Sequence, residues 1–225
     1  NMAPKNGFTP LFSAACKGHT TLVEALLAGG ADPNQPVGAT GDNPLFGVLR
    51  SPKRNTEVVQ ALLDAGAICD VENEKGMSAL RLAIERDVSD SIMDLLMAHG
   101  ASVSAPNARG EPLLHSFCSR AADPKTAPRV VRLLAMGAPV DAVHEGALRP
   151  QTALHVAAAV KGGEAACQVL VDYQVDCTLV DSAGRTALMV AIESGHLASV
   201  KAIVGSPTSD LGFVNNVTGQ TALHL

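Results

Sequence analysis

The chain has 225 residues, of which 47% are hydrophobic and only 3% aromatic, with no tryptophan. Its formal net charge of −5 at pH 7 gives no general reason to bind nucleic acid or an acidic membrane surface. No apolar run approaches the length of a membrane span, and no signal peptide is visible. The five cysteines lack metal-ligand spacing, which favours a reducing compartment, cytoplasmic or nuclear.

The stretch 7–34 predicts two short helices followed by an extended polar loop. Thr9 can cap a helix that begins at Pro10, and Gly18 can end that helix. The second helix has apolar side chains at i, i+1, i+4 and i+5, namely Leu22, Val23, Leu26 and Leu27. Gly30 can adopt the left-handed conformation that closes a helix. One such helix pair cannot bury its apolar face alone, so it must stack on copies of itself.

The copies are found along the whole chain. A leucine of the first helix recurs with gaps of 34, 35, 34, 40, 34 and 35 residues, at Leu11, Leu45, Leu80, Leu114, Leu154, Leu188 and Leu223. This period divides the chain into repeats at about 7–40, 41–75, 76–109, 110–149, 150–183 and 184–218, with a partial seventh at 219–225. Because the last repeat stops inside its first helix, we expect the natural protein to continue.

Three sequence features recur at fixed places, namely Thr9-Pro10-Leu11 or Thr152-Ala153-Leu154-His155 at the opening, Gly18-His19 between the helices, and Gly30-Ala31-Asp32 at the close. With these features the chain resembles the ankyrin repeat family. The resemblance implies an all-α solenoid of stacked helix-turn-helix units with β-hairpin-like finger loops, forming one domain over 1–225. It also implies a curved stack that binds a partner protein or an extended peptide in its concave groove, without any cofactor.

Several repeats are irregular. In the fourth, Pro112 takes the capping place and Phe117 replaces a small alanine. The segments 51–55 and 119–129 lengthen inter-helix turns, and the finger loop at 143–150 is also extended. We expect 119–129 to be an exposed turn, since it contains two prolines among small and polar residues. Gln174 stands where a positive φ is expected.

Catalytic or metal chemistry has little support in the sequence. His115, His155 and His224 each occupy the motif histidine place, where the resemblance implies a hydrogen bond that stabilises the loop and the helix start. Neighbouring stacked helices lie about 8–10 Å apart, whereas zinc ligation needs nitrogens within about 2.1 Å of one ion. No Ser–His–Asp or Cys–His–Asn set and no phosphate-binding loop can be assembled. We therefore expect neither an enzyme nor a metal site.

The candidate site is the expected groove. Its residues come from the finger loops and from the exposed side of the first helices: Ser13, Met77, Leu82, Arg86, Glu111, Ser116, Arg120, Val156, Lys161, Arg185 and Val190. Leu82 and Val156 are expected to hold an apolar side chain of the partner. A basic rim of Lys17, Arg50, Arg86, Arg120 and Lys161 would face carboxylates or phosphates, which predicts an acidic partner along repeats two to five.

The function predicted from the sequence is non-catalytic protein recognition, by a module that is a monomer in isolation and part of a larger intracellular scaffold or regulatory protein. Direct binding to a membrane is not expected. Two alternatives stay open. One is an autoregulatory or substrate-recruiting domain of a multidomain enzyme, such as a kinase or ubiquitin ligase, and the other is the cytosolic domain of a membrane protein. The sequence does not identify the partner.

Overall fold

The computed structural model describes residues 7–120, 123–144 and 150–225. The chain divides into two compact units, Asn1–Ser102 and Val103–Leu225, each of which is treated by itself. Twelve α-helices and two short 3₁₀-helices make up the regular structure of the described residues, in which no strand is present. The all-α class is confirmed, whereas one domain over 1–225 stays a prediction.

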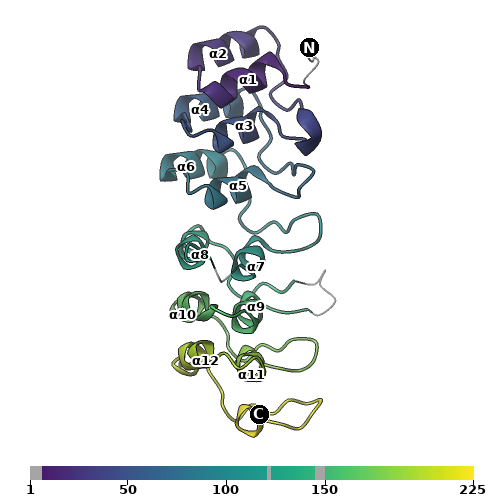
Figure 1. Ribbon diagram of the computed structural model, residues 1–225, viewed down its shortest axis with the longest axis vertical. Coiled ribbons are helices and arrows are strands. Elements are labelled where there is room, and N and C mark those ends of the chain that lie inside the picture. The colour runs from purple at the N-terminus through teal and green to yellow at the C-terminus, as the bar shows by residue number, and fades with distance from the viewer. Residues whose placement is uncertain (1–6, 121–122, 145–149) are drawn as a thin grey trace. The chain divides into compact units, whose positions relative to one another are not determined.

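The N-terminal unit contains three helix pairs: α1 (Pro10–Lys17) with α2 (Thr20–Ala28), α3 (Pro44–Arg50) with α4 (Thr56–Asp64), and α5 (Ala79–Glu85) with α6 (Asp90–Ala98). A 3₁₀-helix, η1 (Gly38–Thr40), lies in the loop before α3. The first helices α1, α3 and α5 pack in one row, and the second helices α2, α4 and α6 pack in another (Figure 1). We call these the inner and outer helices.

The C-terminal unit repeats this arrangement: α7 (Leu113–Cys118) with α8 (Thr126–Ala135), α9 (Ala153–Ala159) with α10 (Glu164–Asp172), and α11 (Ala187–Glu193) with α12 (Leu197–Val204). Here α7, α9 and α11 are the inner helices, and α8, α10 and α12 are the outer ones (Figure 1). Finger loops precede the inner helices. In this unit antiparallel bridges close two of these loops, at Val143–Thr152 and Val180–Thr186, and in the N-terminal unit one closes the loop at Val37–Asp42. A short 3₁₀-helix, η2 (Ala222–His224), follows α12.

The helix boundaries follow from local chemistry. The Thr9 hydroxyl accepts a hydrogen bond from the Phe12 amide at 3.1 Å, and Pro10 takes the first helical position. Gly18 ends α1 with φ +69°, and Gly30 follows α2 with φ +82°. Gln174 takes the same left-handed conformation as Gly30, at φ +59°, as its place in the repeat predicts.

The core of each unit is the recurring leucine with its neighbours. This leucine is buried in the first six repeats, which confirms the register of the period. Leu223, in the partial seventh repeat, is instead 78% exposed and lies in η2. None of the described helices is long and apolar enough to cross a membrane.

The segment 119–129 is only partly the exposed turn that the sequence predicts. Ser119, Arg120, Pro124 and Lys125 are exposed outside any helix, but residues 126–129 are helical. The outer helix α8 already begins at Thr126, whose side chain is buried and donates a hydrogen bond from Oγ1 to the Arg120 carbonyl at 2.8 Å. Pro128 fits within the first turn of α8 because the amides there have no intrahelical partner. Of the lengthened segments, residues 121–122 and 145–149 lie outside the described residues.

Candidate functional site

The motif histidines have the hydrogen bonds that the sequence predicts. In α9, His155 forms a hydrogen bond through Nδ1 with the Thr152 hydroxyl at 2.8 Å and another through Nε2 with the Arg185 carbonyl at 2.9 Å. His115 meets the Gln151 carbonyl through Nε2 at 2.9 Å, and His224 meets Thr221 at 2.7 Å. Burial lowers the pKa of both His115 and His155, and the carbonyl bonds only partly oppose this shift. His115 and His155 thus join their helices to the finger loop of the next repeat.

The cysteine thiols are poorly suited to nucleophilic chemistry. Burial raises the pKa of Cys69 to about 11 and that of Cys167 to about 12, and it also raises the pKa of Cys16 and Cys118. A reactive cysteine needs the opposite shift, because the thiolate is the nucleophile. Among the described residues, no group of three or more histidine, cysteine or acidic side chains is placed to hold a metal ion.

Four residues of the expected groove are buried, so the expectation that they face open solvent is wrong. Leu82 is 1% exposed, Ser116 3%, Val190 6% and Val156 8%. The reason is that the inner helices of neighbouring repeats pack directly on one another, as α9 and α11 do. Ser116 also turns its hydroxyl back to the Leu113 carbonyl at 2.9 Å. These side chains belong to the core between repeats.

Other expected groove residues are occupied by contacts within the chain. The Arg185 guanidinium pairs with Asp181 at 2.6 Å and also with Glu193. Burial alone would raise the pKa of Asp181, but hydrogen bonds from Arg185 outweigh it and hold that pKa below its usual value. Glu111 accepts a hydrogen bond from the Asn107 side chain at 3.1 Å.

One cation of the predicted basic rim is paired within the chain. Arg50 is paired with Asp42 at 2.9 Å, and Asp42 in turn accepts a hydrogen bond from Asn73 at 2.6 Å. Lys17, Arg86, Arg120 and Lys161 are exposed at the ends of inner helices or in the turns that follow. Ser13 and Met77 are half-buried. Lys17 and Arg86 lie in the N-terminal unit, and Arg120 and Lys161 lie in the C-terminal unit.

An aromatic pair in the N-terminal unit lies outside the predicted set of site residues. The rings of Phe8 and Phe12 stack with their centroids 5.3 Å apart, and Phe8 is 43% exposed. Gly47 in α3 makes room for this pair, since a Cβ there would lie 3.0 Å from the Phe12 ring. The available signal was the pair of phenylalanines at i and i+4, together with Gly47, which stands in the next repeat at the place of Ser13. We call Phe8 and Phe12 the aromatic patch.

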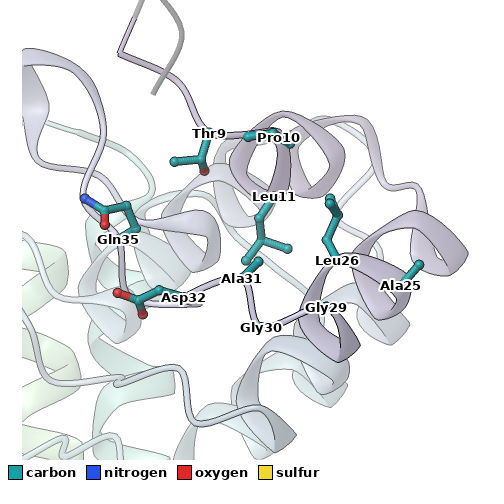
Figure 2. A pocket seen from close by; sticks show the side chains of 10 residues that line it. All are labelled: Thr9, Pro10, Leu11, Ala25, Leu26, Gly29, Gly30, Ala31, Asp32 and Gln35. Carbon is teal, nitrogen blue, oxygen red and sulfur yellow. The ribbon is translucent and has the colours of Figure 1, made fainter. Parts of the chain in front are cut away.

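A cavity of about 440 Å³ lies between α1, α2 and the loop that follows them (Figure 2). Leu11 and Leu26 point toward one another in its wall, and Asp32 lies at its edge (Figure 2). One repeat further, Leu62 takes the place of Leu26 and is fully buried, with α4 packed on α2. The cavity is therefore the stacking face of the first helix pair, without a cluster of titratable groups.

The family comparison agrees with this architecture. The family model for ankyrin repeats in three copies matches residues 11–107 and 118–213. The chain belongs to the ankyrin repeat family. Ankyrin repeats are protein–protein interaction modules, and their stacked units provide extended binding surfaces.

Two curated relatives illustrate the range of proteins with similar repeats. An ankyrin repeat and KH domain-containing protein of Caenorhabditis briggsae is 33% identical over 114 residues, which cover 50% of this chain and 4% of the relative. Human ankyrin repeat and SOCS box protein 18 is 31% identical over 160 residues, covering 57% of this chain and 34% of the relative. The ankyrin chain thus spans a minor part of the relatives it matches.

Solved structures show the same fold. The ankyrin repeat domain of Bcl-3, described as a unique member of the IκB protein family, aligns with a TM-score of 0.76 at 23% identity, covering 98% of this chain and 94% of that one. The human ASB11 ankyrin repeat domain aligns with a TM-score of 0.66 at 19% identity, covering 96% and 91%. At such identities the likeness concerns the fold alone.

Proposed function

We propose that this chain is a non-catalytic recognition module that holds a segment of a partner protein against the finger side of its inner helices. The observation that carries the proposal is the aromatic patch. Large aromatic side chains dominate binding energy at protein interfaces. In a chain with only five phenylalanines, this stacked pair leaves one of them, Phe8, exposed to solvent. The patch thus replaces the buried Leu82 and Val156 as the apolar contact for the partner.

The packing around the aromatic patch supports this role. The Phe12 ring lies against Gly47, and Phe8 stacks on Phe12. On the other side, a Cβ at Gly38 in the next finger loop would lie 3.9 Å from the Phe8 ring. At these two contacts the patch is bordered by glycine backbone rather than by a bulky side chain. A rigid, accessible anchor loses little conformational entropy when a partner binds it.

An acidic partner segment is part of the proposal. Lys17 and Arg86 are exposed near the ends of α1 and α5, and no ion pair joins either of them to a carboxylate within the described residues. Such cations steer association and set specificity more than they add affinity, and salt screens them within about 8 Å. Reversing both to glutamate should slow association and reduce its salt dependence.

The test is affinity capture of a partner with the whole chain, followed by titration of the identified partner. Phe8→Ser should weaken binding at least tenfold, since it removes an anchor from the proposed interface. Leu22→Ser is the matched control, because Leu22 is similarly exposed but lies on the outer helix α2. Binding that survives Phe8→Ser but is lost in Leu22→Ser would place the interface on the outer helices instead.

A further inference from the structure

Two adjoining cavities lie on the outer helices α10 and α12 of the C-terminal unit. Their volumes are about 400 and 540 Å³, and they share Glu164 and Ala198 in their walls. We call them together the outer groove. It is formed by outer helices, whereas the aromatic patch lies on the finger side of another unit. No residue of the aromatic patch contributes to it.

Small side chains form the floor of the outer groove. Ala165 and Ala198 are the second residues of α10 and α12, and Ala202 lies one turn further along α12. The second residues of α2, α4 and α6 are polar instead: Thr21, Glu57 and Ser91. The alanines thus leave room in the C-terminal unit where the N-terminal unit has polar side chains. A helix can approach such a floor closely, at interaxial distances of about 8–10 Å.

An exposed leucine stands at one end of the groove. Leu197 is the first residue of α12 and is 65% exposed. The first residues of the other outer helices are polar, namely Thr20, Thr56, Asp90, Thr126 and Glu164. An isolated exposed leucine needs no explanation, but one beside a small-residue groove offers an apolar contact that a partner can cover.

The charges around the groove favour an acidic occupant. Its lining residues include two lysines, Lys161 and Lys201, against one carboxylate, Glu164. Neither lysine is joined to a carboxylate by an ion pair in the described part of the chain. Lys201 is the fifth residue of α12, whereas the fifth residues of α2 and α6 are Glu24 and Asp94. The fifth residue of α4 is the neutral Gln60, so no outer helix of the N-terminal unit has a cation at this position.

We propose that the outer groove docks an amphipathic helix of a partner protein, with an aliphatic side chain against Leu197 and the alanine floor. Carboxylates that flank its apolar row would face Lys161 and Lys201. Helix-in-groove recognition uses apolar anchors at i, i+3 or i+4 and i+7, and such a row fits along a floor made by two packed helices. Glu164, between the two lysines, requires a neutral or basic residue at the facing position of the partner helix.

The probes are two synthetic helical peptides with the same leucine row, one flanked by glutamates and one by lysines. They are titrated into the ¹⁵N-labelled whole chain while amide chemical shifts are followed. The glutamate peptide should shift the signals of Ala165, Leu197 and Ala198, and it should bind at least tenfold more tightly than the lysine peptide. Equal binding of both peptides, or no shift at these three signals, would overturn the proposal.

Charge-reversal variants complete the test. Lys161→Glu with Lys201→Glu should weaken the glutamate peptide at least tenfold, and Leu197→Ala should weaken it without changing its salt dependence. Both lysines and Leu197 are exposed, so these variants should keep the circular dichroism spectrum of the parent. Glu24→Lys is the matched control, since it changes the same helix position in the other unit and should leave affinity unchanged. Phe8→Ser should also leave it unchanged, so failure here and failure of the finger-side site are distinguishable.

Discussion

At the scale of single residues, the residue at the capping position decides whether Nδ1 of a motif histidine has a hydrogen-bond partner. In α9, Thr152 gives His155 Nδ1 a hydroxyl partner, and its amide also approaches that nitrogen at 3.4 Å. In α7 the capping residue is Pro112, which has neither a hydroxyl nor an N–H. Accordingly, His115 Nδ1 is buried without a hydrogen-bond partner in the described residues. Such a buried polar atom costs about 1–3 kcal/mol.

Pro112→Thr should restore this cap. The Thr variant should be about 0.5–2 kcal/mol more stable than Pro112→Ala, which loses the proline ring equally but lacks the hydroxyl. Pro112 has φ −61° and ψ 147°, an extended conformation that threonine adopts without strain. Urea unfolding of the two variants measures the difference. Equal midpoints and slopes would show that the His115 side chain finds another partner.

The sequence alone could predict most of these residue roles but not the exposure of the groove residues. The histidine bonds, the Thr9 cap and the positive φ of Gln174 depend on local spacing, which the repeat makes readable. Whether Leu82 or Val156 faces solvent depends on how closely the next inner helix packs, which no local pattern states. The orphaned nitrogen of His115 could have been predicted, because Pro112 is visible in the sequence.

At the scale of elements, the packing of the neighbouring repeats decides which side of an inner helix is exposed to solvent. Every residue of α3 from Pro44 to Leu49 is buried. The side expected to face the groove is covered at Gly47, where the Phe12 ring and Cys16 of α1 lie over the backbone. The beginning of α8 illustrates the same point. Proline and small residues near Thr126 are typical of a turn, but the Thr126 side chain is buried and hydrogen-bonds the Arg120 carbonyl. Contacts with neighbours thus decide what the short segments become.

Gly47→Ala should therefore destabilise the protein, although alanine is the better helix former by about 0.8–1 kcal/mol. A Cβ at this position would lie 2.9 Å from Cys16 Sγ and 3.0 Å from the Phe12 ring, so these two side chains or the helices that hold them would have to shift. We expect a loss of about 1–3 kcal/mol, as for other overpacked sites. Chemical denaturation measures it.

The background variant Phe12→Ala serves as the control for this packing. In that background Gly47→Ala should lose much of its cost, because one of the two clashing groups is gone. A cost that is identical in both backgrounds would mean that the glycine is needed for a reason other than the seat of Phe12. The same pair also tests whether the aromatic patch depends on Gly47 for its position.

At the scale of the whole molecule, the histidines whose pKa is shifted by burial lie in the C-terminal unit. They are His115 and His155, whose pKa values burial lowers. The carboxylates of Asp176 and Asp181 in the same unit also have lowered pKa values. Hydrogen bonds from Thr178 stabilise the charged form of Asp176, and those from Arg185 stabilise the charged form of Asp181. Mild acid should therefore destabilise the C-terminal unit by protonating its buried histidines, and strong acid should destabilise it by protonating these carboxylates.

The free energy of unfolding should fall as the pH falls from 7.5 to 5. A histidine with a lowered pKa in the folded state binds its proton more readily when the chain is unfolded, where its pKa is about 6.5. Its contribution is complete above that value and is lost progressively as the pH falls toward the folded pKa. The carboxylates affect the free energy of unfolding only at lower pH, because their stabilisation is lost below their usual pKa of about 3.9. Between pH 7.5 and 5 the slope should thus come from the two histidines, and hydrogen exchange should show the earliest loss of protection in α7 and α9. A free energy of unfolding that is constant or rises over this range would contradict the burial of neutral imidazoles in the C-terminal unit.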